Sequence, residues 1–223
     1  MISSCNIACG GHAGDTSSMQ HAILLAKKYG VKVGAHPSYP DRSNFGRASQ
    51  EMTSEALIDT VRGQIAELNT ILKREKTALH HIKAHGALYN DIARDAELAG
   101  VYLEALADYK EDVPLYVPYK SEIAELARGS GYSVIYEAFG DRNYHEDLRL
   151  VSRRHPKALI EDPRAVLEHI VRMVQHGHVR TLSGENIQIK AETLCIHGDT
   201  PLAFEIVSYL SNQLPEQNIQ IKK

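Results

Sequence analysis

Short apolar, strand-like runs alternate with amphipathic, helix-like runs along almost the whole chain of 223 residues. The strand-like runs cover residues 2–9, 31–35, 79–84, 114–117, 133–138 and 192–196, with a very short one at 158–160. The helix-like runs carry apolar residues at helical spacing and cover residues 16–29, 53–73, 92–109, 120–128, 163–176 and 201–213. Repeated strand–helix units predict an α/β protein with a parallel sheet and right-handed crossovers.

Two parallel architectures fit this alternation, a closed β/α barrel and an open doubly wound sheet. Polar clusters follow nearly every strand-like run, whereas an open sheet would gather them at one switch point. This distribution favours the barrel, and the open sheet remains the second choice. The chain has no Pro/Ser-rich linker or low-complexity tract, so residues 1–223 are predicted to form one domain.

Composition excludes several classes of partner. The net charge is −3 and the acidic and basic residues are intermixed, which predicts no nucleic-acid partner and no anionic membrane surface. No apolar stretch approaches the ~20 residues that cross a bilayer. The three cysteines form no CxxC pair, which predicts buried thiols and a cytoplasmic location.

Four histidines follow strand-like runs and stand beside glycine or proline: His12, His36, His85 and His197. In either architecture the loops after the strands share one edge of the sheet, where barrel active sites lie. Acidic and basic side chains are expected at the same edge, namely Glu137, Asp141, Arg142 and Asp199. Imidazole and carboxylate groups together suit general acid–base catalysis or a divalent metal site. The ordinary alternative is that each histidine only hydrogen-bonds its own loop.

Two cationic side chains could bind an anion. Strand alternation over residues 79–84 predicts that His81, Lys83 and His85 share one face, opposite His80. Lys83 then either contacts a carboxylate or oxyanion, or extends to solvent. Arg47 could clamp a substrate carboxylate, and a structural salt bridge is the alternative.

Other histidines and motifs carry less information. Five histidines are predicted to be solvated on helices or in charged loops: His21, His155, His169, His176 and His178. The sequence contains no Walker A pattern, no GxGxxG after a strand, no GxSxG elbow and no HExxH. A serine nucleophile therefore has no motif support, and the ligands of any metal would come from separate strands.

Five blocks in order resemble the LamB/YcsF family, also known as the A-type subunit of 5-oxoprolinase, from Ser3 to about Leu214. They are NIACGGHAGD (6–15), GAHPSYPDRSNFGR (34–47), IKAHGALYN (82–90), EAFGDRNY (137–144) and CIHGD (195–199). The resemblance implies a TIM-like, seven-stranded β/α barrel related to glycoside hydrolase and deacetylase barrels. It also implies ATP-dependent hydrolysis of 5-oxo-L-proline to L-glutamate together with two further subunits. An unstrained lactam resists hydrolysis, and phosphorylation of its oxygen by the co-substrate ATP would activate it.

The resemblance also implies site residues, carried over position by position. Those expected to be catalytic are His12, His85, Glu137, His197 and Asp199. Those expected to bind substrate are Asn6, His36, Arg47, Lys83, Tyr89, Asn90, Asp141 and Arg142. Asp15 and Asp41 match as well. The candidates for a possible divalent metal are His12, His36, His85 and His197.

The chain departs from the family pattern at two places. Gly11 stands where the family commonly carries Phe, which would remove an aromatic wall from the pocket. Family members begin with an acidic strand of the Asp-Leu-Asn-x-Asp-Leu-Gly-Glu type, and nothing similar precedes Ile2. We therefore expect the barrel to lack its first strand.

Two other functions compete with the family assignment. The histidine and carboxylate residues would also suit a stand-alone metal-dependent amidase or deacetylase acting on a lactam or a carbohydrate. The missing acidic strand and the absent nucleotide motif would suit a non-catalytic scaffold subunit.

Overall fold

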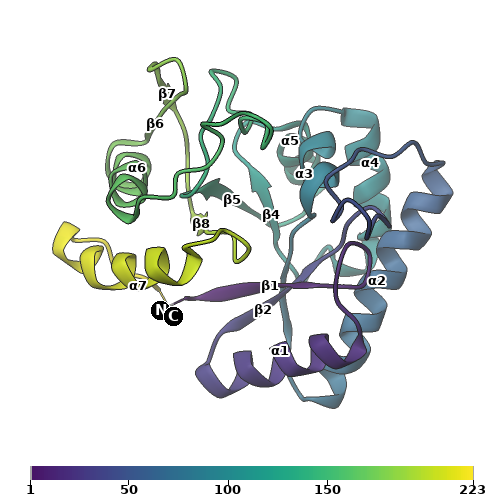
Figure 1. The fold of residues 1–223 in the computed structure, drawn as a ribbon. Coiled ribbons are helices and arrows are strands. Elements are labelled where there is room, and N and C mark those ends of the chain that lie inside the picture. Colours follow the sequence, from purple (N-terminus) through teal and green to yellow (C-terminus); the bar gives the residue numbers. More distant parts are fainter. Residues whose placement is uncertain (1, 223) are drawn as a thin grey trace. The chain divides into compact units, whose positions relative to one another are not determined.

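The computed structural model describes residues 2–222, and it is an α/β structure in which the chain forms two compact units (Figure 1). We call residues 3–135 the N-terminal unit and residues 136–222 the C-terminal unit, and each is described by itself. No helix within residues 2–222 is long and apolar enough to cross a membrane.

The N-terminal unit alternates strands with helices, as the sequence predicted. Its elements are β1 (Ser4–Ala8), α1 (Thr16–Tyr29), β2 (Lys32–His36), α2 (Ser54–Arg74), β3 (Leu79–Ile82), α3 (Gly86–Ile92), α4 (Ala96–Ala105), a 3₁₀ turn (Ala107–Tyr109), β4 (Leu115–Pro118) and α5 (Glu122–Gly129). The strands are parallel and hydrogen-bonded in the order β1-β2-β3-β4.

Local chemistry explains where the long helices begin and end. Asp15 accepts the Ser18 backbone N–H at the start of α1, and Gly30 ends that helix in the left-handed conformation with φ of 65°. Thr53 caps α2 by accepting from the Ala56 N–H. The buried apolar side chains of α2 recur at helical spacing and pack into the core: Leu57, Ile58, Val61, Ile65, Leu68, Ile71 and Leu72.

The C-terminal unit contains a parallel strand pair and an antiparallel hairpin. Its elements are β5 (Val134–Phe139), α6 (Pro163–His176), β6 (His178–Arg180), β7 (Asn186–Gln188), β8 (Thr193–Cys195), α7 (Ala203–Gln213) and a 3₁₀ turn (Pro215–Gln217). Strands β5 and β8 pair in parallel, and β6 pairs with β7 antiparallel. Asp162 caps α6, whose first residue is proline, and Gly177 ends it in the left-handed conformation.

The structure corrects five expectations. Of the thiols predicted to be buried, only Cys9 is; Cys5 and Cys195 are partly exposed, because each lies on a strand that pairs, within residues 2–222, on one side only. Residues 92–109 do not form one helix, because Asp95 accepts the Leu98 N–H and starts α4 anew after α3 has ended. Residues 158–160 form only an isolated bridge, from Leu159 to Arg142. The β6–β7 hairpin was not predicted. His169 is buried rather than solvated, because it lies on the inner face of α6.

Candidate functional site

Three of the predicted histidines meet in the N-terminal unit. The rings of His12 and His85 are stacked, with centroids 3.6 Å apart and planes 7° apart. The His36 ring stands edge-on to both, at 5.7 Å from His12 and 4.8 Å from His85. We call these three residues the imidazole cluster. Their convergence agrees with the expectation that the loops after β1, β2 and β3 share one edge of the sheet.

Backbone carbonyls determine which nitrogens of the imidazole cluster carry hydrogen. His36 Nδ1 lies 2.7 Å from the Lys83 carbonyl, and His85 Nε2 lies 2.9 Å from the Phe45 carbonyl. A carbonyl only accepts, so both nitrogens donate. The remaining nitrogens, His36 Nε2 and His85 Nδ1, lie 3.1 Å apart. A hydrogen bond between them therefore requires one extra proton on the pair.

Burial and neighbouring cations oppose that extra charge. Desolvation, together with the nearby His85 and Arg47, lowers the pKa of His12 to about 3. Desolvation also lowers the pKa of His36 well below its usual value, with contributions from His85 and Lys83. His12 and His36 are thus neutral near pH 7 and act through directed hydrogen bonds. An anion placed beside them would favour the charged form.

His12 is held in place by a hydrogen bond to Ser38, a residue that was not predicted from the sequence. Its Nδ1 lies 3.0 Å from Ser38 Oγ, and that hydroxyl donates to the Tyr39 carbonyl at 2.8 Å. The hydroxyl hydrogen is thereby used, so Ser38 accepts from His12. Ser38 is fully buried and follows His36 by two residues, but a single serine in a Pro-rich loop gave no periodic signal.

A tight loop carries Phe45 and Arg47 against the imidazole cluster. Asp41 organises this loop by accepting hydrogen bonds from Ser43 and Asn44, which lower the pKa of its carboxyl group. The Phe45 ring stands edge-on to His12 and His85, at 5.1 and 5.4 Å. The Arg47 guanidinium lies 5.0 Å from the Phe45 ring. The loop therefore brings an exposed cation to the edge of the cluster.

Close packing at Gly46 explains why a glycine follows Phe45. A Cβ atom there would lie 2.9 Å from both His12 Cβ and His85 Cδ2, and the backbone has φ of 65°. Any side chain would push the loop away from the imidazole cluster.

The other predicted residues of the N-terminal unit lie nearby in sequence but have distinct contacts. Lys83 is buried, and its Nζ lies 5.6 Å from the ring of Tyr89, which is also buried. Asn90 is exposed and donates to the Gly86 carbonyl within α3. Asn6 lies on β1, where its side-chain oxygen is 2.8 Å from His81 Nε2.

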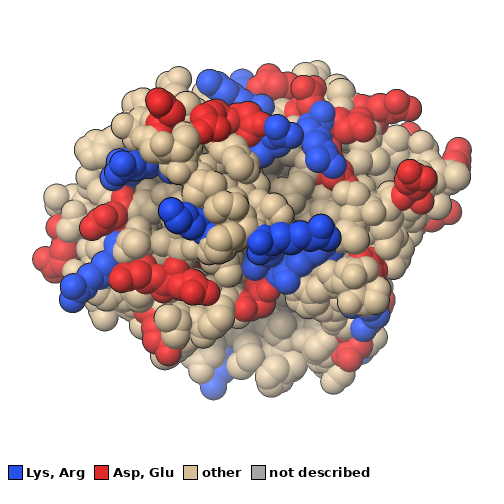
Figure 2. All heavy atoms as spheres, turned by 45° about the horizontal axis from the view of Figure 1, so that its top comes forward, with Lys and Arg blue, Asp and Glu red and all other residues tan. Residues whose placement is uncertain are grey.

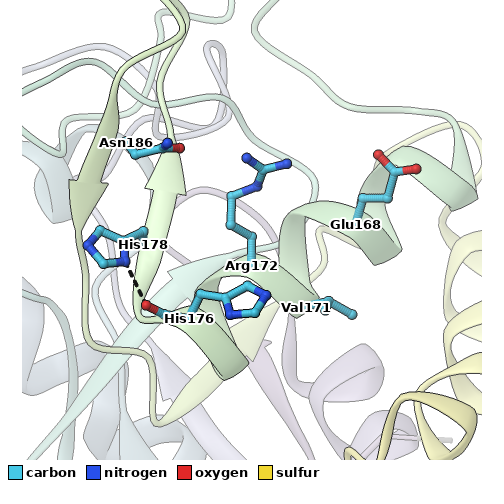
Figure 3. A pocket seen from close by; sticks show the side chains of 6 residues that line it. All are labelled: Glu168, Val171, Arg172, His176, His178 and Asn186. Atoms are coloured by element: carbon cyan, nitrogen blue, oxygen red, sulfur yellow. Dashed lines mark hydrogen bonds between the residues drawn. The ribbon is translucent and has the colours of Figure 1, made fainter.

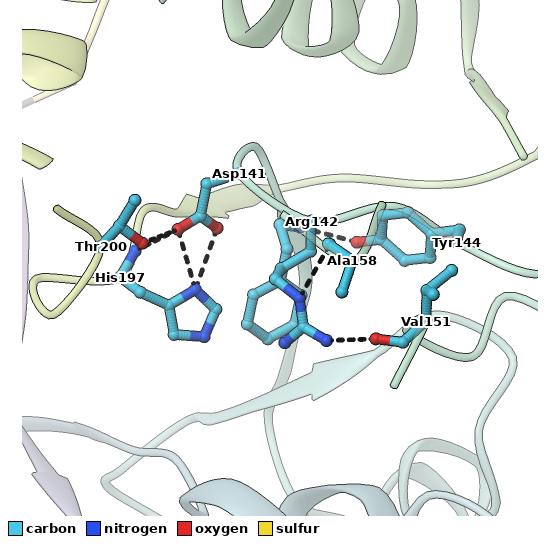
Figure 4. Close-up of polar contacts among 8 residues, drawn as sticks. Asp141, Arg142, Tyr144, Val151, Ala158, His197 and Thr200 are labelled. Atoms are coloured by element: carbon cyan, nitrogen blue, oxygen red, sulfur yellow. Dashed lines mark hydrogen bonds and ion pairs between the residues drawn. The ribbon is translucent and has the colours of Figure 1, made fainter. Parts of the chain in front are cut away.

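In the C-terminal unit, by contrast, a histidine is hydrogen-bonded to a carboxylate. His197 Nδ1 lies 2.9 and 3.0 Å from the two carboxylate oxygens of Asp141 (Figure 4). The backbone N–H of His197 donates to the same carboxylate at 2.9 Å. Thr200 Oγ1 donates to it at 3.0 Å. We call this arrangement the Asp141–His197 pair. Thr200 was not predicted, since nothing in the sequence links it to residue 141.

The Asp141 carboxylate is held ionised inside the protein. Complete burial raises its pKa, but the hydrogen bonds and charge of His197 and the hydrogen bond from Thr200 outweigh burial and leave the pKa below its usual value. His197 retains partial exposure, with 20% of its side-chain surface accessible. Its Nδ1 is directed at the carboxylate, and its Nε2 points away from Asp141 (Figure 4).

The neighbouring predicted residues frame this pair. Phe139 stacks on His197 at 5.2 Å between ring centroids. Arg142 is buried and donates to the carbonyls of Val151 and Ala158, at 2.6 and 3.3 Å, which ties down the following loop. Glu137 is buried on β5, and Asp199 is exposed beyond β8.

A separate cavity of about 590 Å³ lies between α6 and the β6–β7 hairpin (Figure 3). It contains none of the predicted site residues and is lined by Glu168, Val171, Arg172, His176, His178 and Asn186. All of these side chains are at least partly exposed, and His178 Nδ1 donates to the His176 carbonyl at 2.6 Å. Acidic and basic side chains are mixed over the visible surface, as the near-neutral net charge predicts (Figure 2).

The side chains of residues 2–222 give little support for a bound metal ion. No group of three or more His, Cys, Asp and Glu side chains in this range is arranged to hold a metal ion. In the imidazole cluster, the stacking of His12 on His85 directs ring faces rather than nitrogens at each other.

The helices alternate with parallel strands, and histidine-rich polar side chains follow the strands. These features are typical of a barrel-like α/β protein. The model of the LamB/YcsF family matches residues 1–223, and the chain belongs to this family. It is 42% identical to the A-type subunit of 5-oxoprolinase from Thermococcus sibiricus, covering 99% of this chain and 86% of that protein. It is 39% identical to the corresponding subunit from Bordetella pertussis, covering 99% and 88%.

A solved structure gives the same result for the fold. The crystal structure of the lactam utilization protein from Thermus thermophilus superposes with a TM-score of 0.91 at 37% identity. The match covers 99% of this chain and 88% of that one. The predicted family and the barrel-like α/β fold are therefore confirmed.

Proposed function

We propose that this chain acts as the A-type subunit of a 5-oxoprolinase, in the ATP-dependent hydrolytic opening of 5-oxo-L-proline to L-glutamate with two partner subunits. Membership of the LamB/YcsF family and relatives of that name at about 40% identity support this proposal. The proposal includes ATP as co-substrate and a cytoplasmic location, which the free thiols of Cys5, Cys9 and Cys195 favour.

The observation that carries the proposed chemistry is the Asp141–His197 pair. A carboxylate that accepts from Nδ1 fixes the imidazole tautomer and leaves Nε2 as a base. Hydrolysis of a lactam needs such a base, because water must lose a proton as its oxygen bonds to the carbonyl carbon. The C–N bond then breaks, and the ring nitrogen takes up a proton to become the amino group of glutamate. We assign His197 to the proton transfers and Asp141 to orienting it.

We assign anion and carbonyl recognition to the N-terminal unit. Arg47 and Lys83 are cations beside the imidazole cluster, and 5-oxoproline carries a carboxylate and a polarised lactam oxygen. Phosphorylation of that oxygen by ATP would release ADP and add negative charge, which the same donors would stabilise. After the first water has added and the C–N bond has broken, a second water would release the phosphate from the resulting acyl phosphate to leave the carboxylate of glutamate. In their neutral forms the N–H groups of His12 and His85 already donate to Ser38 and to the Phe45 carbonyl, so each ring offers the ligand an acceptor nitrogen. The low pKa of His12 argues against a charged acid at that position.

The test is glutamate release by the reconstituted complex with ATP and 5-oxoproline, with and without this chain. We expect release only when all subunits and ATP are present. His197→Ala and His197→Gln should abolish most of it while the complex still assembles. Full activity of both variants would instead support the scaffold function, and no release from the complete wild-type complex would overturn the proposal.

Two finer expectations stay predictions, a seven-stranded barrel lacking its first strand and a divalent metal at His12, His36, His85 or His197. A stand-alone metal-dependent amidase would retain metal through gel filtration and lose activity with a chelator. Elemental analysis of the purified chain distinguishes it from the ATP-dependent enzyme, whose activity should survive the chelator once Mg²⁺ is restored with the nucleotide.

A further inference from the structure

One row of residues crosses three parallel strands in register, from Asn6 on β1 through Gly34 on β2 to His81 on β3. Residues paired in this way point to the same face of a sheet, and adjacent strands lie roughly 4.8 Å apart. Asn6 and His81 are thus separated by an intervening strand. Even so, His81 Nε2 lies 2.8 Å from Asn6 Oδ1.

Two features of the backbone allow this contact across β2. A Cβ atom on Gly34 would lie 2.1 Å from His81 Nε2, so only a glycine leaves room for the ring. The register also shifts by one residue on β3, where Val33 pairs with Leu79 but Gly34 pairs with His81. Such bulges re-aim side chains, and this one turns His81 over the glycine.

The His81 ring is fixed on its other sides. It stacks on Tyr116 of β4, with centroids 3.9 Å and planes 13° apart, and it has no solvent exposure. His80 Nδ1 lies 3.1 Å from His81 Nδ1. Burial, together with the nearby His80 and Lys83, lowers the pKa of His81 to about 3. His81 is therefore a neutral imidazole with a single N–H near pH 7.

One N–H on His80 and one on His81 are enough to form both hydrogen bonds, the one between the two rings and the one to Asn6. His80 Nδ1–H donates to His81 Nδ1, and His81 Nε2–H donates to the carboxamide oxygen of Asn6. The oxygen end of the Asn6 carboxamide then faces His81, and its NH₂ end faces away. The next residues of the same face, Ala8 and His36, lie one layer further along β1 and β2, roughly 6.6 Å on. Asn6 therefore lies in the layer next to the imidazole cluster.

We propose that His81 is a positioning residue, which orients the Asn6 carboxamide so that its NH₂ group donates to an acceptor oxygen of the ligand. The proposal rests on the proposed function and deepens it: the acceptor is the carboxylate or the lactam oxygen of 5-oxoproline. Because neutral His81 holds the carboxamide one way round, the site selects an acceptor at this position and disfavours a ligand that presents a donor there.

Kinetics of the complete complex test this role in two ways. His81→Leu removes the donor, and Gly34→Ala displaces the ring while leaving both His81 and Asn6 in the chain. In each variant KM for 5-oxoproline should rise about tenfold while kcat changes less than about threefold, as expected for loss of one oriented hydrogen bond. His81→Gln, whose amide can donate to Asn6, should restore most of the affinity. The matched control is Gly63→Ala on α2, where an added Cβ meets nothing within 4 Å.

A measurement without turnover separates this inference from the proposed function. Nitrogen-15 NMR of the folded chain should show His81 neutral with its hydrogen on Nε2 from pH 5 to 8, and His81→Leu should shift the Asn6 side-chain NH₂ signals. A hydrogen on Nδ1 would mean a reversed carboxamide and overturn the inference. Unchanged KM in folded His81→Leu and Gly34→Ala complexes would overturn it as well. If the wild-type complex released no glutamate, the proposed function would fail, and the tautomer and the Asn6 signals would still decide how Asn6 is oriented.

Discussion

The imidazole cluster and the Asp141–His197 pair use the same side chain in opposite electrostatic settings. In the imidazole cluster, His12 and His36 face other imidazoles, Arg47 and Lys83, and their pKa values are lowered. In the Asp141–His197 pair, the histidine faces a buried carboxylate whose own pKa is lowered by that contact. A cationic imidazole is thus disfavoured in the first setting, whereas in the second setting the imidazole lies beside a carboxylate that is held ionised.

The difference assigns the two regions different kinds of work. A base that accepts a proton from water must carry positive charge for part of the reaction, and a neighbouring carboxylate stabilises that charge. Imidazoles that stay neutral are better suited to orient the loops and a ligand through hydrogen bonds, and Arg47 and Lys83 beside them are the groups that meet an anion. Strand-end position alone did not distinguish these roles, because all four histidines looked alike in sequence.

The largest effect should come from removing the base. His197→Ala should lower kcat of the reconstituted complex by about 10²–10⁴, the range typical of general acid–base groups, with KM for 5-oxoproline nearly unchanged. His176→Ala is the matched control, since His176 is exposed at the end of α6 in the same unit. A kcat within threefold of wild type would remove the proposed division of roles.

Removing the cation at the edge of the imidazole cluster should affect binding instead. Arg47→Ala should raise KM for 5-oxoproline about tenfold to a hundredfold, the expected range for a lost charge-assisted contact, with a smaller change in kcat. Arg42→Ala gives a control in the same loop. If Arg47→Ala lowered kcat and left KM unchanged, Arg47 would act in the chemical step. The assignment of substrate binding to the N-terminal unit and of chemistry to the Asp141–His197 pair would then be wrong.

The sequence predicted the strand–helix order because each element carries its own periodicity and cap, as Asp15, Thr53 and Asp162 illustrate. It predicted the meeting of His12, His36 and His85 because parallel strands end at one edge. It could not predict the contact between His81 and Asn6, which depends on a one-residue bulge and on the space above Gly34. Such features arise from register, which sequence periodicity leaves undetermined.

The same limit explains the error at His169 and the omission of Thr200. A histidine on an amphipathic helix is predicted to be solvated unless it is known which face of the helix is buried. The buried face of α6 includes His169. Thr200 contacts Asp141 across 59 residues of sequence, and no local pattern encodes so distant a contact.

The pH dependence of stability should separate the two regions. His12 has a pKa of about 3 in the folded chain and about 6.5 when unfolded, so the unfolded chain binds more protons between these values. Its contribution to the free energy of unfolding is therefore lost as pH falls from about 6.5, by up to about 1.4 kcal/mol per pH unit. Asp141 has a depressed pKa, and its contribution is lost only below about pH 4.

Urea unfolding of the chain at pH 7, 6 and 5 checks this order. His12→Gln should make the free energy of unfolding less dependent on pH between 7 and 5, whereas Asp141→Asn should leave the slope in that range unchanged. His21→Gln controls for an exposed histidine. Equal slopes for wild type and His12→Gln would show that the folded chain binds this proton as readily as the unfolded one.

The smallest effect should come from the hydroxyl that supports the carboxylate. Thr200→Val keeps the shape of the side chain and removes its hydrogen bond to Asp141, so the carboxylate loses one of the contacts that hold it ionised. Three donors surround Asp141 in the wild type, and two from His197 remain in the variant. We therefore expect kcat to fall only about threefold to tenfold, with Thr181→Val, a buried threonine in the same unit, as control. A loss as large as that of His197→Ala would mean that Asp141 depends on Thr200 for its position, and that the Asp141–His197 pair is a three-residue unit.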